Sequence, residues 1–254
     1  MSTKHKIINE KIAIQVSGGP SVMNGYLARP ATDGTFPGVI IGMEIFGVND
    51  HIKDITNRVA ELGYVAIAVD FYHRTEPNLE LSYDTAGRNK GMELMGQLSR
   101  EEVLEDVEAT MAFLTSTENI SGKIGFIGFS IGGHIAYLAA TQLEIAVTIC
   151  FYAGWIVNPD IKLSQPEPTV KLTSGIAKHG GQLVYFVGGQ DSLITKEQLD
   201  LMSTALKSAE VRYELTIYPE AMHGFFCDQR PLTFSNTASD DAWKKIQKIL
   251  SDGL

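Results

Sequence analysis

The chain has 254 residues, of which 44% are hydrophobic, 20% charged and 9% aromatic, a globular composition that excludes a disordered, collagenous or coiled-coil chain. Its net charge of −9 argues against a nucleic-acid-binding surface, because phosphate contacts need clustered Lys and Arg. Its two cysteines, Cys150 and Cys227, are too few for a disulfide framework or a cysteine-rich zinc site.

Targeting segments are not indicated by the sequence. Residues 1–11 are polar and mixed in charge, so they do not resemble a signal peptide. No apolar run approaches the ~20 residues that a transmembrane helix needs. We therefore expect a cytoplasmic protein with no nucleic-acid or membrane partner, and the sequence gives no indication of its oligomeric state.

Short β-branched runs alternate with helical patterns along the chain. The expected strands are 11–16, 23–29, 37–45, 64–72, 123–129, 145–152, 183–187 and 211–218. The expected helices are 51–62, 99–115, 132–141, 196–207 and 238–250. The segments 75–98 and 155–178 show no pattern that assigns them to an element.

Turn and cap residues mark where several of these elements begin and end. A Gly-Gly-Pro turn joins the first two strands, which predicts an antiparallel pair. Asp50 is the expected cap of the first helix, and Gly63 is expected to end it. Ser99 is the expected cap of the second helix, with Glu102 as its capping-box partner.

This order predicts a single α/β domain, residues 1–254, with a mostly parallel sheet and helices on both faces. Ligands of such sheets bind beyond the carboxyl ends of the strands. Functional residues are therefore expected in the loops that follow strands.

One such loop contains the motif G-x-S-x-G, at Gly128-Phe129-Ser130-Ile131-Gly132. The motif lies between an expected strand and an expected helix, which is the context of a nucleophile elbow. There, a sharp turn exposes the serine hydroxyl, and the N-terminus of the helix favours a developing negative charge. We therefore predict that Ser130 is a nucleophile.

A serine nucleophile needs a histidine base and an acid, in the chain order Ser, Asp or Glu, His. His223 follows the strand 211–218, whereas His134 lies within a helix and His179 at the opposite edge of the sheet. Asp191 follows the strand 183–187. The other acids considered lie in a proline-containing loop or on or after a helix: Asp160, Glu167, Asp200 and Glu210.

The oxyanion of an acyl-transfer reaction needs two aimed donors. The first is expected to be the backbone N–H of Ile131, which follows the nucleophile. The second is expected from the loop after the strand 37–45, where we choose the backbone N–H of Ile45.

The chain resembles the dienelactone hydrolase family of α/β hydrolases over nearly its whole length. The motifs that carry the resemblance are Glu44-Ile45-Phe46-Gly47-Val48-Asn49, Asp70-Phe71-Tyr72-His73-Arg74, Gly128-Phe129-Ser130-Ile131-Gly132-Gly133, Gly188-Gly189-Gln190-Asp191 and Met222-His223-Gly224-Phe225. The resemblance implies an α/β-hydrolase fold and hydrolysis of an ester or enol-lactone through an acyl-enzyme. It implies no metal or organic cofactor.

The chain departs from this family at two places. Ser130 stands where the best-known members have cysteine, so the role of Glu44, which matches a glutamate that contacts that cysteine, is open. The alternative is that Glu44 has a structural role, as a buried carboxylate held by neighbouring amides. Arg74 matches a carboxylate-binding arginine, but Cys227 stands where a second arginine is expected, and Arg230 is shifted from that position.

Three aromatic residues, Tyr72, Trp155 and Phe225, are candidates to line the substrate pocket or to belong to the core. The leading hypothesis is a serine carboxylesterase or lactonase with a small-molecule substrate. Amide or peptide hydrolysis, perhydrolysis, an inactive ligand-binding protein and a cysteine nucleophile remain as alternatives.

Overall fold

The computed structural model describes residues 4–16, 22–117 and 120–254. In this part of the chain, eight strands form one sheet in the order β1-β2-β4-β3-β5-β6-β7-β8. The strands are β1 (Ile7–Gln15), β2 (Val22–Pro30), β3 (Phe36–Gly42), β4 (Val65–Val69), β5 (Ile120–Phe129), β6 (Val147–Phe151), β7 (Gln182–Gly188) and β8 (Arg212–Tyr218). The helices are α1 (Asp50–Glu61), α2 (Thr85–Met95), α3 (Arg100–Ser116), α4 (Ile131–Gln142), α5 (Ser174–Lys178), α6 (Lys196–Ser208) and α7 (Asn236–Gly253), with short 3₁₀ turns η1 (Lys162–Ser164) and η2 (Thr169–Leu172).

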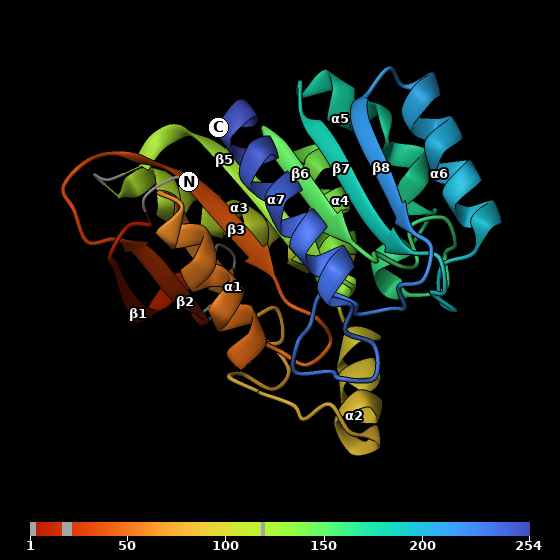
Figure 1. Cartoon of the computed structure of the whole chain (residues 1–254), viewed down its shortest axis with the longest axis horizontal. Helices are drawn as coiled ribbons and strands as arrows, with labels where there is room; N and C mark the ends of the chain where they lie inside the picture. The colour runs from red at the N-terminus through yellow and green to blue at the C-terminus, as the bar shows by residue number, and fades with distance from the viewer. Residues whose placement is uncertain (1–3, 17–21, 118–119) are drawn as a thin grey trace.

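The sheet is mostly parallel, as the alternation of elements predicts. β3 to β8 run parallel to one another, whereas β2 pairs antiparallel with both β1 and β4. The predicted antiparallel pair is thus confirmed, and its Gly-Gly-Pro turn lies outside the described residues. Helices cover both faces, with α1 and α7 in front of the sheet and α3 and α4 behind it in Figure 1.

The centre of the sheet is its most buried part. Every residue of β4 and of β6 is buried, which explains their nearly unbroken apolar sequences. By contrast, β8 at the edge alternates between exposed and half-buried residues. The core therefore lies along β3 to β7.

Two helix starts differ in detail from the sequence prediction. The cap of α1 is Asn49 rather than Asp50, because the Asn49 side chain accepts from the Ile52 amide at 3.3 Å. Asp50 is instead the first residue of the helix. Ser99 caps α3 as predicted, but Glu102 accepts from the Ser99 hydroxyl at 2.7 Å instead of bonding to a backbone amide.

Helix α2 lies within the segment 75–98 that the sequence left unassigned. It projects below the carboxyl ends of the strands in Figure 1. It packs closely against the loop after β3, because a Cβ at Gly91 would lie 2.5 Å from the Ile45 carbonyl oxygen. The Tyr72 hydroxyl donates to the carbonyls of Ile45, at 3.2 Å, and Gly91, at 3.4 Å. The loop and the helix are thus held together at one point.

The second unassigned segment, 155–178, contains η1, η2 and α5. Among the described residues, no helix combines the length and the apolar character required to cross a membrane.

Candidate active site

Ser130 lies at a sharp turn between β5 and α4. Its backbone has φ 53° and ψ −113°, a conformation that is uncommon for a residue with a side chain. The turn is held by the Ser130 amide, which donates to the Phe151 carbonyl at 2.9 Å. Strained backbone of this kind persists only where the surrounding structure fixes it, and it is typical of a nucleophile elbow.

The glycines of the motif allow close approach of neighbouring backbone. A Cβ at Gly132 would lie 2.5 Å from the Gly42 carbonyl oxygen and 2.6 Å from that of Met43. The Gly132 amide also donates to the Met43 carbonyl at 3.0 Å. Only glycine at position 132 therefore allows α4 to begin directly against the end of β3.

The structure brings Ser130, His223 and Asp191 together from three different loops. Ser130 Oγ lies 3.0 Å from His223 Nε2, and His223 Nδ1 lies 2.8 Å from Asp191 Oδ2. Since a carboxylate only accepts, Nδ1–H donates to Asp191 and Nε2 accepts from the Ser130 hydroxyl. The other oxygen of Asp191 accepts from the Leu193 amide at 2.9 Å. The carboxylate is fully buried, so its orientation is fixed.

The amides of Ile45 and Ile131 flank the same turn. Ile131 is the first residue of α4, and Ile45 lies in the loop after β3. Neither amide donates a hydrogen bond to another group within the part of the chain that the structure describes. The Gly132-to-Met43 hydrogen bond joins the two segments that carry them.

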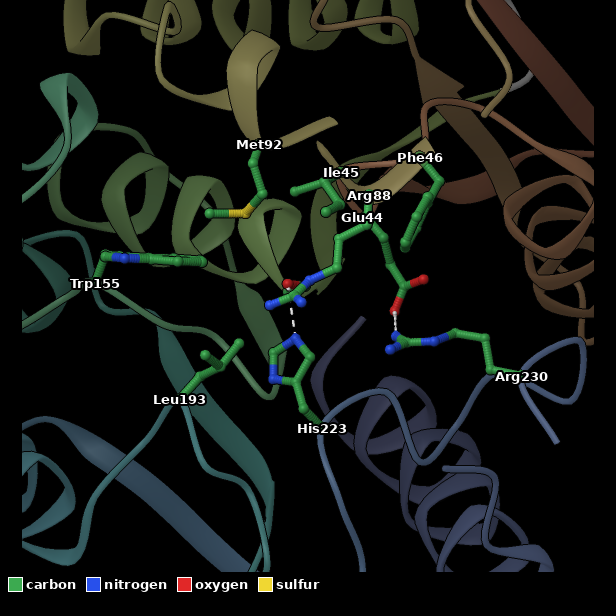
Figure 2. Close-up of a pocket in the computed structure, with 10 residues that line it drawn as sticks. Glu44, Ile45, Phe46, Arg88, Met92, Trp155, Leu193, His223 and Arg230 are labelled. Atoms are coloured by element: carbon green, nitrogen blue, oxygen red, sulfur yellow. Dashed lines mark hydrogen bonds and ion pairs between the residues drawn. The ribbon is translucent and has the colours of Figure 1, made fainter. Parts of the chain in front are cut away.

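A pocket of about 470 Å³, open to solvent, contains Ser130 and His223. Its remaining lining residues are Glu44, Ile45, Phe46, Arg88, Met92, Trp155, Leu193 and Arg230. In Figure 2, Met92, Trp155 and Leu193 lie to one side of His223, and the Glu44–Arg230 pair lies to the other side together with Phe46.

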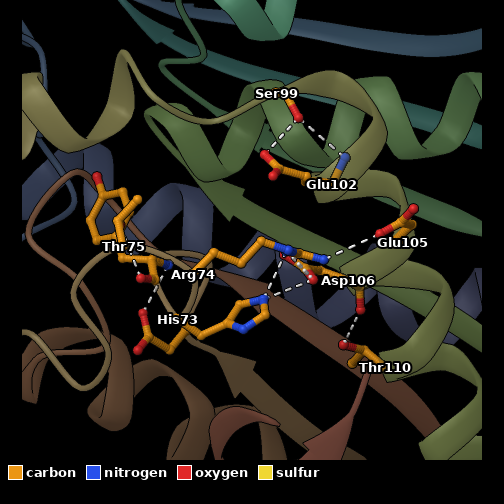
Figure 3. Close-up of polar contacts among 10 residues, drawn as sticks. His73, Arg74, Thr75, Ser99, Glu102, Glu105, Asp106 and Thr110 are labelled. Atoms are coloured by element: carbon orange, nitrogen blue, oxygen red, sulfur yellow. Dashed lines mark hydrogen bonds and ion pairs between the residues drawn. The ribbon is translucent and has the colours of Figure 1, made fainter. Parts of the chain in front are cut away.

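Arg74 does not line this pocket, in contrast to what the family resemblance implied. Its guanidinium donates to both carboxylate oxygens of Asp106, at 2.7 and 2.8 Å, and to Glu105 at 3.3 Å. His73 Nε2 also lies 3.0 Å from Asp106, so the buried acid on α3 holds this whole segment (Figure 3). Arg74 is therefore occupied in an ion-pair network and is not free to bind substrate.

The arginines that do line the pocket are Arg88 and Arg230. Arg88 lies on α2, and its side chain has no ion pair within the described ranges. Arg230 Nη1 lies 3.6 Å from Glu44 Oε1. Arg230 was expected to be shifted from the position of the second arginine, whereas Arg88 was not expected, because its only signal is a basic residue in a polar segment without helical periodicity.

Glu44 lies at the pocket but is almost completely buried, with 1% of its surface exposed. Neither carboxylate oxygen has a hydrogen-bond partner among the described residues, so the alternative of a carboxylate held by amides is not what the structure contains. Its charge faces the guanidinium of Arg230, which is its ion-pair partner.

Tyr72 and Phe225 are fully buried and do not line the pocket, whereas Trp155 does. His134 is also buried, and its Nε2 lies 2.8 Å from the Thr169 hydroxyl. Burial lowers the pKa of His134 to about 3. It is thus a packing histidine, on the core side of α4 rather than its surface.

The two cysteines are buried free thiols. Burial raises the pKa of Cys227 to about 12 and raises that of Cys150 further. A thiol with a raised pKa is a poor nucleophile, because the thiolate is the reactive form. The described residues contain no group of three or more His, Cys, Asp or Glu side chains that could hold a metal ion.

Comparison with known proteins gives similarities that extend along most of the chain. The model of the dienelactone hydrolase family matches residues 23–253. A Synechocystis sp. protein named carboxymethylenebutenolidase is 39% identical over 231 residues, which cover 91% of this chain and 92% of that protein. A Bradyrhizobium sp. protein named 2-oxo-3-(5-oxofuran-2-ylidene)propanoate lactonase is 30% identical over 219 residues, covering 86% of this chain and 84% of that protein. A crystal structure described as a dienelactone hydrolase from Klebsiella pneumoniae superposes with a TM-score of 0.86 at 26% identity, covering 97% of this chain and 99% of the other.

Proposed function

The chain belongs to the dienelactone hydrolase family, and we propose that it hydrolyses carboxylic esters or lactones through a Ser130–His223–Asp191 triad and an acyl-enzyme. The observation that carries the proposal is the pair of contacts of 3.0 and 2.8 Å that joins hydroxyl, imidazole and carboxylate across 93 residues of sequence. The family resemblance inferred from the motifs is confirmed by the family match and the relatives.

The proposed reaction begins when Ser130 Oγ attacks the carbonyl carbon of the substrate. The hydroxyl proton passes to Nε2 of His223, and the resulting imidazolium is stabilised by Asp191. Collapse of the tetrahedral intermediate breaks the bond to the alcohol oxygen, which takes the proton from His223. Water then attacks the carbonyl carbon of the acyl-enzyme as His223 takes its proton, and the second tetrahedral intermediate collapses to release the acid and return the proton to Ser130 Oγ. In a lactone, the leaving alcohol remains part of the same molecule.

The amides of Ile45 and Ile131 are the proposed donors to the oxyanion. Both are uncommitted within the described structure, and Ile131 opens α4, whose N-terminus favours negative charge. The hydrogen bond between Gly132 and Met43 supports this role, because it keeps the two donor-bearing segments at a fixed separation.

The charges at the pocket favour an ester or lactone that carries an anionic group. Among the residues that the structure describes, Arg88 presents a guanidinium without an ion pair to the pocket, and Arg230 has one ion-pair partner, Glu44, at 3.6 Å. Guanidinium groups bind carboxylates well, through parallel hydrogen bonds. The Bradyrhizobium relative supports this preference, since its name describes a lactonase that acts on a propanoate.

The triad is tested with a panel of p-nitrophenyl ester, lactone, anilide and peracid-forming substrates. We expect esters or lactones to be the best substrates, and Ser130→Ala to lower kcat by at least ~10³-fold. Ser208→Ala, on an exposed position at the end of α6, is the matched control. A fluorophosphonate probe should label Ser130, its oxygen displacing fluoride from phosphorus.

Each of the alternative functions has its own outcome in this experiment. Preference for anilides or for perhydrolysis would replace the proposed reaction. Absence of both labelling and turnover would identify a ligand-binding protein. Full turnover by Ser130→Ala would remove Ser130 from the mechanism.

The preference for an anionic substrate is tested by the ratio of kcat/KM for p-nitrophenyl hemisuccinate to that for p-nitrophenyl butyrate. Arg88→Gln should lower this ratio by roughly 10-fold or more, the usual effect of losing a hydrogen bond to a charged group. Arg212→Gln is the matched control, because Arg212 is exposed on β8 and lies outside the pocket. An equal effect of the two variants would contradict the assignment.

A further inference from the structure

A second cavity lies next to the proposed active site, on the other side of Trp155. It is open to solvent, which its volume of about 220 Å³ includes, and the enclosed space is no larger than about one water molecule. Its lining is mainly apolar and comes from the loop after β6, from β7, and from the loop before α6 together with the first turns of that helix. The residues are Ala153, Gly154, Trp155, Ile156, Val157, Tyr185, Ile194, Gln198, Leu199 and Met202.

Trp155 lines both this cavity and the pocket that contains Ser130. The adjacent residues Leu193 and Ile194 are divided in the same way, with Leu193 at the pocket and Ile194 at the second cavity. In Figure 2 the indole of Trp155 lies flat at the apolar end of the pocket, opposite the Glu44–Arg230 pair. Trp155 is thus the residue that the two spaces share.

The backbone of Trp155 is held in an unfavourable conformation. Its φ is +59°, in the left-handed region where a bulky residue is an outlier. Its carbonyl accepts from the buried Ser164 hydroxyl at 2.7 Å, which contributes to fixing this geometry. Such strain is retained where the surrounding structure fixes it, and it concentrates at functional sites.

The apolar end of the pocket also leaves hydrophobic surface in contact with water. Leu193 is 40% exposed and Met92 is 37% exposed. An apolar chain of a bound ester that covered these side chains would remove their surface from water, which favours binding. The charged end of the pocket offers no such gain, so an apolar chain is expected to extend toward Trp155.

We propose that Trp155 is a specificity-determining residue, whose indole limits the length of the apolar chain that the ester can carry. The inference rests on the proposed ester or lactone hydrolysis and deepens it. The substrate class is an ester with an apolar chain that ends at the indole, and removal of the indole frees the volume of that side chain between the pocket and the second cavity. Longer chains then become substrates.

The test is a chain-length series in two forms, p-nitrophenyl acetate to decanoate and n-alkyl acetates from ethyl to decyl, so that both the acyl and the alcohol side are sampled. The variant is Trp155→Gly, because glycine removes the indole and adopts a φ of +59° without strain. Trp155→Phe is the conservative variant. The measured quantity is the kcat/KM ratio of the C8 to the C4 substrate in each series.

The wild-type enzyme should favour short chains. Trp155→Gly should raise the C8 to C4 ratio by about 10-fold or more in one series, since each buried methylene contributes roughly four-fold. Trp155→Phe should raise it less. Val157→Phe, added to Trp155→Gly to refill the volume that the indole leaves, should restore the wild-type ratio, an effect that a general loosening of the site would not produce.

Unchanged ratios in both series would overturn the proposal, as would a wild-type enzyme that accepts C8 and C4 equally. These failures are distinguishable from failure of the proposed function. If only the chain-length proposal is wrong, the wild type still hydrolyses p-nitrophenyl acetate with dependence on Ser130, but the limit on chain length is absent. If no ester or lactone is hydrolysed with dependence on Ser130, both the function and this inference are wrong.

Discussion

Replacing Gly132 by alanine tests whether close contact between α4 and the end of β3 holds the site together. The added Cβ would lie 2.5 Å from the Gly42 carbonyl oxygen and 2.6 Å from that of Met43, whereas ordinary contact begins at 3.4 Å. Relief requires one segment to move by about 0.9 Å, and backbone rather than a flexible side chain has to move. The movement also stretches the hydrogen bond from Gly132 to Met43.

Two consequences are expected, and both can be measured. Overpacking and the weakened hydrogen bond should together lower the free energy of unfolding by about 2–4 kcal/mol. The proposed oxyanion donors Ile45 and Ile131 lie on the two segments that separate, and a displacement of this size costs ~10²-fold in rate. Urea unfolding and kcat/KM for p-nitrophenyl acetate report the two effects separately.

Two other glycines provide graded controls. A Cβ at Gly42 would lie 2.9 Å from the Gly132 carbonyl oxygen, so Gly42→Ala should be intermediate. A Cβ at Gly154 would meet nothing within 4 Å, so Gly154→Ala should leave stability nearly unchanged. If Gly132→Ala retained wild-type stability and rate, or if the three variants did not follow this order, the steric argument would be refuted. Should Gly132→Ala fail to fold, the comparison of Gly42→Ala with Gly154→Ala still decides the question.

Two further predictions concern stability. Asn49→Ala removes the cap of α1 and the donor to the Tyr83 hydroxyl at 2.8 Å. Urea unfolding should therefore show that the free energy of unfolding falls by about 1–2 kcal/mol, whereas Asp50→Ala should lower it by only about a few tenths of a kcal/mol. The reverse ranking would restore Asp50 as the cap. Burial lowers the pKa of His134 to about 3. Between about pH 6.5 and 3, the unfolded chain therefore binds a proton at this histidine that the folded protein does not bind. The free energy of unfolding consequently falls as the pH falls through this window. The wild type should therefore lose about 2 kcal/mol more of its free energy of unfolding between pH 7 and 4.5 than His134→Gln does. If the unfolding free energies of the variant and the wild type depended on pH in the same way, His134 would not be the origin of the acid sensitivity.

The sheet and most of its helices were predictable because their sequence patterns match their burial. β4 and β6 are uninterrupted apolar runs, and each is buried along its whole length. The candidate Ser130, His223 and Asp191 could be chosen because each follows a strand at the carboxyl edge of a parallel sheet. The G-x-S-x-G motif, the chain order and the position of that edge selected them as candidates, without knowledge of any side-chain distance.

Helix α2 could not be predicted in the same way. Its buried face consists of Gly87, Gly91, Leu94 and Met95, and two of these four residues carry no side chain. Hydrophobic periodicity detects apolar side chains that are buried in the core. Helix α2 is instead held by backbone contact with Ile45 and by the Tyr72 hydroxyl. The pocket residue Arg88 was missed for this reason.

The placement of Arg74 was wrong because its decisive partner lies elsewhere in the chain. Asp106 is a buried acid on α3, 32 residues away, and it binds both His73 and Arg74. A buried carboxylate on a helix with surface acids on either side of it gives no sequence signal of its own. The motif resemblance identified the segment correctly but could not tell which arginine beyond β4 reaches the pocket.

The way α2 is attached has a consequence for how this enzyme could diversify. Arg88 and Met92 reach the pocket from a short helix that lies outside the layered sheet and contributes little to its packing. Substitutions at exposed positions of residues 85–95 can therefore change which molecules are recognised while the folding core stays intact. A combinatorial library confined to the exposed positions of this helix, with the buried Gly87, Gly91, Leu94 and Met95 kept, would sample new selectivities at low risk of misfolding.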